Sequence, residues 1–243
     1  MVELVSRMAA GDRSAARGRA GPHGADQCTA GAECEALARR FAGTEAEPLA
    51  RSVAVWAVLS GVGNPAFRYR SVYEFLLQEG LGFDCKPLPP DVCAGAPGLC
   101  YANCRAIALR RQARYAYCEG IASADHGIPV QHAWLLDLVD GRAVDPTWRG
   151  EPTARAYIGV VVDPRYLAAA FRRSGCVLDD WRARRPILRG EAGDAWRHDW
   201  HRLQAARPVE RCAAPHAAAL APVTRRRAEA PGRCGRTRPR ARG

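Results

Sequence analysis

The sequence predicts an α+β fold in which helices pack against an antiparallel sheet. Two observations indicate this class. Apolar residues follow the helical period in several segments before residue 112, and short segments with strand character follow between residues 114 and 162. The chain has 243 residues, of which 48% are hydrophobic, so it can bury a core of ordinary size. Helices and strands that are grouped along the chain in this way are typical of α+β proteins.

Helices are expected in four places. The segment 71–80 has apolar side chains at the helical period, and Gly80 suits its end. The segment 100–111 follows Pro97-Gly98 and finishes with two arginines, which suit the negative end of a helix dipole. The other two expected helices are residues 48–60 and 163–175.

Strands are expected at residues 114–121, 132–139, 142–145 and 156–162. The second and third of these are separated by Asp140-Gly141, and Asp-Gly is a strong short-range signal for a β-hairpin. Pro146 then ends the returning strand. The central order is therefore helix, strand, hairpin and strand.

Composition divides the chain into three parts. Residues 1–47 are rich in Ala and Gly and poorly periodic, so we expect a weakly ordered segment with a helix near residues 34–43. Residues 48–205 form the predicted domain. Residues 206–243 are an Arg/Pro/Ala-rich tail that we expect to be disordered.

The net charge of +11 is concentrated in that tail. It contains ten arginines against two glutamates, a net +8, which leaves +3 for the rest of the chain. A nearly neutral body lacks a strong nucleic-acid signature. Arginine makes up 35 of the 36 basic residues, which indicates either phosphate recognition or GC-rich coding, and the abundance of alanine favours the latter.

The sequence favours a cytoplasmic location. Its beginning has no apolar run of signal-peptide length, and no run of eighteen apolar residues is long enough for a membrane span. Without a secretory signal, the ten cysteines do not indicate a disulfide framework. No Cys-x-x-Cys pair occurs, so we expect no metal site.

Cys100 is the candidate nucleophile. It lies in the first turn of a predicted helix, where free backbone N–H groups and the helix dipole favour a thiolate. The same N–H groups can stabilise the oxyanion of a tetrahedral intermediate. Cys104 lies one turn further along the same helix face and is a rival nucleophile, but it is not at the helix start.

His132 and Asp145 are the candidate base and its orienting carboxylate. His132 opens a predicted strand, and Asp145 ends the strand that returns beside it. A carboxylate at that position can accept a hydrogen bond from one imidazole nitrogen while the other nitrogen faces the thiol.

The motifs GLCYANC, ARYAYCEGIA and HAWLLDLVDGRAVDPTW resemble the core of the transglutaminase-like superfamily, which has a papain-type thiol fold. The resemblance covers about fifty residues, 98–148. It implies a Cys100, His132 and Asp145 triad, with Trp134 and Trp148 at aromatic positions that frame the site. It also implies transfer of the acyl group of a peptide or protein amide, without a cofactor. The sequence departs from the family pattern at Tyr101, where many members have tryptophan.

Strand register sets a condition on this triad. A two-residue Asp140-Gly141 turn would place Asp145 opposite Leu136, about 13 Å along the strand from His132. A four-residue loop over 138–141 instead pairs Asp145 with Trp134, within reach of His132. We therefore expect the longer loop or an equivalent bulge.

Four side chains are candidates for substrate contact: Tyr101, Trp134, Trp148 and Glu119. Glu119 shares a strand face with two tyrosines, and it is interpreted either as a substrate-contacting acid or as an ordinary exposed residue. Asn103 is similarly either part of a polar network near Cys100 or a solvent-facing helix residue.

Two functional hypotheses follow. In the first, the chain is a thiol acyl-transfer enzyme, either a peptidase or amidase or a transglutaminase. In the second, it retains the fold without the activity and acts as a binding protein. In that case the tail, 206–243, contacts nucleic acid through counterion release.

Overall fold

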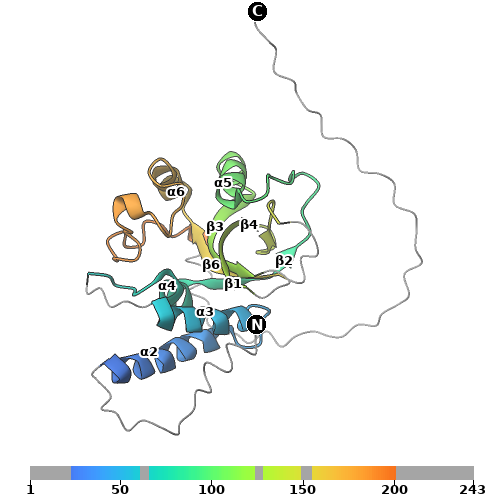
Figure 1. Cartoon of the computed structure of the whole chain (residues 1–243). Helices are drawn as coiled ribbons and strands as arrows, with labels where there is room; N and C mark the ends of the chain where they lie inside the picture. The colour runs from blue at the N-terminus through green and yellow to red at the C-terminus, as the bar shows by residue number, and fades with distance from the viewer. Residues whose placement is uncertain (1–22, 61–65, 124–127, 149–154, 201–243) are drawn as a thin grey trace, which may run out of the picture. The chain divides into compact units, whose positions relative to one another are not determined.

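The computed structural model describes residues 23–60, 66–123, 128–148 and 155–200. It shows a mixed α+β protein with a six-stranded sheet packed against helices (Figure 1). The strand order is β1-β6-β3-β4-β5-β2. The strands are β1 (Leu81–Phe83), β2 (Cys85–Lys86), β3 (Tyr115–Ser123), β4 (Val130–Asp137), β5 (Ala143–Val144) and β6 (Ala156–Val162).

The helices lie before, between and after these strands. They are α2 (His23–Ala38), α3 (Glu47–Ser60), α4 (Val72–Glu79), α5 (Cys100–Arg110) and α6 (Pro164–Phe171), with two short 3-10 helices, η1 (Arg39–Phe41) and η3 (Trp181–Ala183). The four helices and four strands expected from the sequence are all present, with ends that differ by a few residues. The sequence did not predict β1 and β2, which are too short to show a period.

The sheet is antiparallel with one exception. β3 pairs with β4 on one side and with β6 on the other, both antiparallel, and these pairings form its centre. β2 pairs with β5 in the parallel sense at one edge. The expected antiparallel sheet is therefore confirmed at its centre and modified at this edge.

The first described residues belong to the folded unit. Cys34 and Ala38 of α2 and Phe41 of η1 are buried, and they join the same hydrophobic cluster as α3 and α4. The helix expected near residues 34–43 is present. The predicted boundary at residue 47 does not coincide with a break in the structure, because this apolar face of α2 packs against the helices that follow it.

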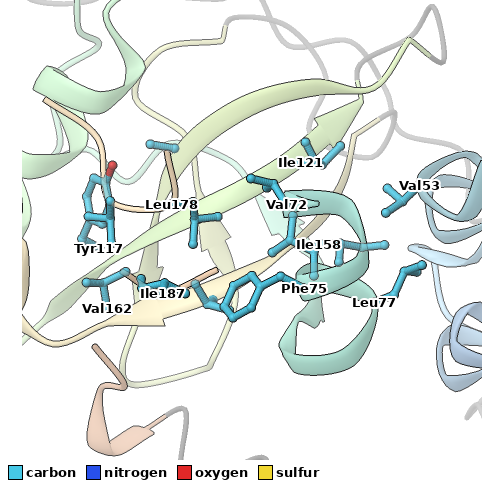
Figure 2. Packing of buried hydrophobic residues seen from close by; sticks show 14 of the residues in the cluster. Val53, Val72, Phe75, Leu77, Tyr117, Ile121, Ile158, Val162, Leu178 and Ile187 are labelled. Carbon is cyan, nitrogen blue, oxygen red and sulfur yellow. The ribbon is translucent and has the colours of Figure 1, made fainter. Parts of the chain in front are cut away.

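One face of the sheet carries the larger core. Phe75 of α4 belongs to one cluster with Ile158 and Val162 of β6 and Tyr117 of β3, and Ile187 lies between Phe75 and Val162 (Figure 2). The side chains of alternate strand residues point to this face, and the helices cover it. Burial of this apolar surface is the main force that holds the helices to the sheet.

The opposite face carries a smaller, aromatic core. Trp134 lies there fully buried, with its ring centroid 5.7 Å from that of Phe83 and 5.0 Å from that of Tyr157. Gly159 makes room for it, because a Cβ at that position would lie 2.4 Å from the Trp134 ring. Trp200 stacks on Phe83 and covers part of this face.

The hairpin between β4 and β5 has the longer loop. Leu135 pairs with Val144 and Leu136 with Ala143, a register that places Asp145 opposite Trp134. The expectation from strand geometry is confirmed.

Asp137 explains why the tight Asp-Gly turn does not form. Its backbone N–H donates to Arg142 O, and its carboxylate accepts from the N–H of Val139. The same carboxylate is fully buried and forms ion pairs with Lys86 and Arg114, which fix it in place. Hydrogen bonds from this one residue close the loop at four residues.

The sequence also supported expectations about membrane spans, disulfides and the C-terminal tail. The helices in the described ranges include none long and apolar enough to cross a membrane. In those ranges, Cys34, Cys85, Cys100, Cys104, Cys118 and Cys176 are free thiols. The predicted arginine-rich tail, 206–243, lies outside the described residues.

Substitution of Gly159 by alanine tests the packing of the aromatic face. The added methyl group would collide with the Trp134 ring and with Glu119 O, so we expect a loss of about 1–3 kcal/mol in the free energy of unfolding. Chemical denaturation would measure it. Gly31→Ala in α2 is the matched control, because nothing lies within 4 Å of the new methyl group and alanine favours the helix by about 1 kcal/mol. Equal effects of the two variants would contradict the packing argument.

Candidate active site

Cys100 is the first residue of α5. Gly98, with φ of +75°, makes the turn before it, and Leu99 occupies the N-cap position without a side-chain cap. The backbone N–H groups of the first turn therefore have no capping side chain, and the N–H of Tyr101 donates to the Cys100 sulfur. The predicted placement of Cys100 at a helix start is present in the structure.

The edge of β4 positions two thiols differently. β5 pairs with β4 only at Leu135 and Leu136, so the N–H and C=O of Ala133 on that edge are left for α5. The N–H of Ala133 donates to the Cys100 sulfur. Its C=O accepts from Cys104, whose sulfur lies 3.3 Å away. One backbone residue thus offers a donor to the first cysteine and an acceptor to the second.

His132 joins the thiol to a carboxylate. Its Nε2 lies 2.8 Å from Asp145 Oδ2 and donates to it, and both side chains are almost fully buried. The imidazole also hydrogen-bonds Cys100, and Nδ1 is the ring nitrogen left for that contact. The structure therefore brings together the three residues that the sequence singled out, in the order thiol, imidazole and carboxylate.

Asp145 is held by four donors. Its Oδ1 accepts from the backbone N–H groups of Thr147, at 2.8 Å, and Trp148, at 3.0 Å. Its Oδ2 accepts from the Tyr157 hydroxyl, at 2.9 Å, in addition to His132. Hydrogen bonds to the charged form of a carboxylate favour that form, so the arrangement keeps Asp145 ionised.

The electrostatics of the three groups are coupled. Burial raises the pKa of Cys100, but the hydrogen bond and charge of His132 and the two backbone N–H groups outweigh it and lower the pKa below that of an ordinary thiol. Burial lowers the pKa of His132, whereas Asp145 and Cys100 raise it to about 9. Burial likewise raises the pKa of Asp145, and His132 with the backbone donors holds it low. At neutral pH these directions favour a thiolate beside an imidazolium.

Cys104 lies in an environment that favours the protonated thiol. It is fully buried, and burial together with the negative charges of Asp145 and Cys100 raises its pKa well above that of a free thiol. Its S–H serves as a donor to Ala133 O. Of the two rival thiols, only Cys100 is set up to ionise.

The two tryptophans occupy different positions. Trp148 is partly exposed and stacks on the His132 ring, with centroids 4.1 Å apart and an interplanar angle of 19°. Trp134 is fully buried in the aromatic core on the far side of the sheet from α5. Trp148 therefore borders the site, while Trp134 offers no surface for the predicted substrate contact and packs against Tyr157, the residue that donates to Asp145.

Glu119 is neither an exposed residue nor a free acid. It is 3% exposed, and its carboxylate accepts from the Tyr117 hydroxyl and from the N–H groups of Val177 and Leu178. Burial raises its pKa to about 7. The predicted substrate contact is not available to this side chain, because its oxygens are engaged in anchoring residues 177–178 to β3.

Tyr101 lies between the nucleophile and that anchored segment. It is partly buried, and burial raises its pKa, as do the negative charges of Glu119, Cys100, Cys176 and Asp179. Its hydroxyl therefore lies within electrostatic range of Cys176 and Asp179. Tyr101 remains a candidate for substrate contact.

Sequence reasoning missed the role of Tyr157. Its hydroxyl reaches Asp145 only because β6 lies beside β3, a pairing that the sequence does not show. Asn103 was left open between two interpretations, and its amide donates to Thr147 Oγ1 at 3.0 Å and to Ala96 O at 2.9 Å. It thus ties α5 to the turn that carries Asp145.

Two hollows lie elsewhere on the described surface. One, of about 540 Å³, lies between α2 and α3, and the other, of about 530 Å³, lies between α5 and residues 91–95. Neither is lined by a residue of the triad. Their volume therefore carries no argument about the chemistry at Cys100. No group of three His, Cys, Asp or Glu side chains within the described ranges could hold a metal ion.

The chain matches none of the protein-family models, curated proteins or solved structures with which it was compared.

Substitution of Asp145 by asparagine tests the coupling. The amide can still accept from Thr147 and Trp148 N–H, but it removes the negative charge that raises the His132 pKa. We expect the His132 titration, followed by NMR of the ring protons, to move from about 9 toward the ordinary value of about 6.5. Asp140→Asn, on the exposed loop of the same hairpin, should leave it unchanged. An unaltered His132 titration in Asp145→Asn would contradict the coupling.

Proposed function

We propose that this chain is a thiol-dependent acyl-transfer enzyme that acts on an amide substrate. The observation that supports this most directly is the position of His132, which hydrogen-bonds the Cys100 thiol on one side and Asp145 on the other. A base that is oriented by a carboxylate and placed against a thiol at a helix start is the arrangement that nucleophilic thiol catalysis requires.

The first half of the reaction forms a thioester. The Cys100 thiolate attacks the amide carbonyl carbon, and the carbonyl oxygen becomes an oxyanion close to the N–H groups at the start of α5. His132, as the imidazolium, gives its proton to the leaving amine. The C–N bond breaks, and Asp145 stabilises the imidazole in the tautomer that the next step needs.

The second half of the reaction releases the acyl group. His132 removes a proton from the acceptor, which then attacks the thioester carbonyl and restores the Cys100 thiolate and the imidazolium. Water as acceptor gives a peptidase or amidase, and a primary amine gives a transglutaminase. The described contacts support both outcomes equally.

We also propose that the fold is that of the transglutaminase-like superfamily, with a papain-like core. The support comes from the motifs over 98–148 together with their arrangement: a nucleophile at the start of α5, a base on β4, and a carboxylate just beyond β5. The surrounding helices and the short strands β1 and β2 do not enter this argument.

Thiol labelling tests the nucleophile. With iodoacetamide at pH 7 and peptide mapping by mass spectrometry, we expect Cys100 to be labelled fastest among the described cysteines. Cys100→Ala should remove this rapid label. His132→Ala should slow labelling of Cys100 about tenfold or more, because each unit by which the thiol pKa rises lowers the thiolate fraction about tenfold.

Two variants control this experiment. Cys104→Ala and Cys176→Ala each remove a thiol whose pKa is raised by burial, and neither should change the rate at Cys100. Rapid labelling at Cys104 would show that Cys104, and not Cys100, is the nucleophile. Slow labelling of every thiol in the native protein would instead favour a catalytically silent fold that acts as a binding protein.

A further inference from the structure

A strained turn lies after α6. Arg184 and Arg185 have φ of 59° and 55°, and they are the only residues other than glycine with positive φ in the described ranges. This region of backbone space is unfavourable for residues with a side chain, and glycine is its usual occupant. Strain of this kind persists only where the surroundings hold it, and it is concentrated at functional sites.

Asp180 holds the strained conformation. Its side chain is fully buried, accepts from the N–H of Ala183 at 3.1 Å, and forms an ion pair with Arg173 at the end of α6. The backbone C=O of Asp180 accepts from the N–H of Arg185 at 2.8 Å. Residues 180–185, here called the basic turn, are therefore a fixed structure.

The basic turn presents an exposed tryptophan among arginines. Trp181 is 60% exposed, and the guanidinium of Arg182 lies 5.2 Å from the centroid of its ring. Arg182 and Arg184 are exposed, and no carboxylate in the described ranges pairs with either. Trp and Arg are the side chains that most often dominate binding energy in protein interfaces. Because the backbone of the turn is fixed before binding, association does not have to order it.

The charge of the folded body is concentrated here. Residues 172–189 contain six arginines and two aspartates, a net +4, whereas residues 1–205 as a whole carry +3. The remainder of the body is therefore slightly acidic. Asp179 pairs with Arg185, Asp180 with Arg173 and Glu191 with Arg189. The charges of Arg182 and Arg184 are not compensated in this way, and they favour an acidic partner.

The basic turn is continuous with the proposed active site. It directly follows Val177 and Leu178, which are anchored to the Glu119 carboxylate. Glu119 lies opposite Ala133 of β4, whose N–H donates to the Cys100 sulfur. A chain that lies along this surface would therefore pass from the basic turn toward the thiol.

We propose that Trp181, Arg182 and Arg184 form a docking surface for an acidic, extended segment of a protein substrate. The surface would deliver a neighbouring amide of the same substrate to Cys100. This inference rests on the proposed thiol chemistry, and it names the substrate class that the chemistry would serve.

A pair of peptide probes tests the docking surface in the full-length chain. Both carry the same chloroacetamide group, and one is rich in glutamate where the other has glutamine. We expect the acidic probe to label Cys100 about tenfold faster than the neutral one at low salt, because charge complementarity accelerates encounter. Arg182→Ala combined with Arg184→Ala should remove this preference, and Trp181→Ala should reduce it.

Labelling by iodoacetamide tests the reactivity of Cys100 independently of the docking surface. The basic-turn variants should leave the iodoacetamide rate at Cys100 unchanged, which also shows that they fold. Arg51→Ala removes an exposed arginine from α3 and should keep the preference for the acidic probe. If iodoacetamide fails to label Cys100 in the native protein, the proposed function itself is wrong.

Three results would overturn the docking proposal while leaving the thiol chemistry intact. The first is an equal rate for the two probes in the native chain. The second is a preference that survives in the basic-turn variants but is lost when Arg225, Arg226 and Arg227 of the tail are replaced by alanine. The third is tighter binding of a labelled single-stranded oligonucleotide than of the acidic peptide through Trp181 and Arg184, which would assign the surface to nucleic acid.

Discussion

The hydrogen bond between His132 and Asp145 is the constraint on which the rest of the site depends. It requires two strands in one register, because a slip of one residue would turn the carboxylate to the other face of the sheet. Asp137 sets that register by closing a four-residue loop through its own backbone and side chain. The ion pairs of Asp137 with Lys86 and Arg114 therefore stabilise the geometry of a site to which none of these residues belongs.

The open edge of β4 is the second determinant. A longer β5 would cover Ala133, and α5 could then not approach its backbone. Because β5 stops after two residues, the start of α5 takes the place of a strand. Cys100 and Cys104 then bond the N–H and C=O of Ala133, which no strand pairs. The sulfur that accepts from N–H groups is favoured as a thiolate, and the sulfur that donates to C=O is kept protonated. Backbone polarity therefore adds to the effect of His132 at Cys100 and to the effect of burial at Cys104, and together these distinguish the two thiols.

Buried acids elsewhere in the fold have an organising role. Glu119 draws residues 177–178 onto β3, and Asp180 fixes the turn that follows. Between them they fix an irregular segment beside β3 without a regular element of secondary structure. Buried carboxylates are costly unless every oxygen has a partner, and both of these acids meet that condition through backbone N–H groups and neighbouring side chains.

The sequence by itself determined the α+β class, the main helices and strands, and the start of a helix at Cys100. It indicated the four-residue loop only as a condition for His132 to reach Asp145, because the Asp140-Gly141 signal by itself favours the tighter turn. These features depend on residues close together in the chain, and the spacing of such residues predicts local structure. The tertiary structure decided the burial of Glu119 and Trp134, the bond from Tyr157 to Asp145, and the packing of α2 on the core. Those features depend on which distant segments meet, and a period along one segment carries no information about its partner.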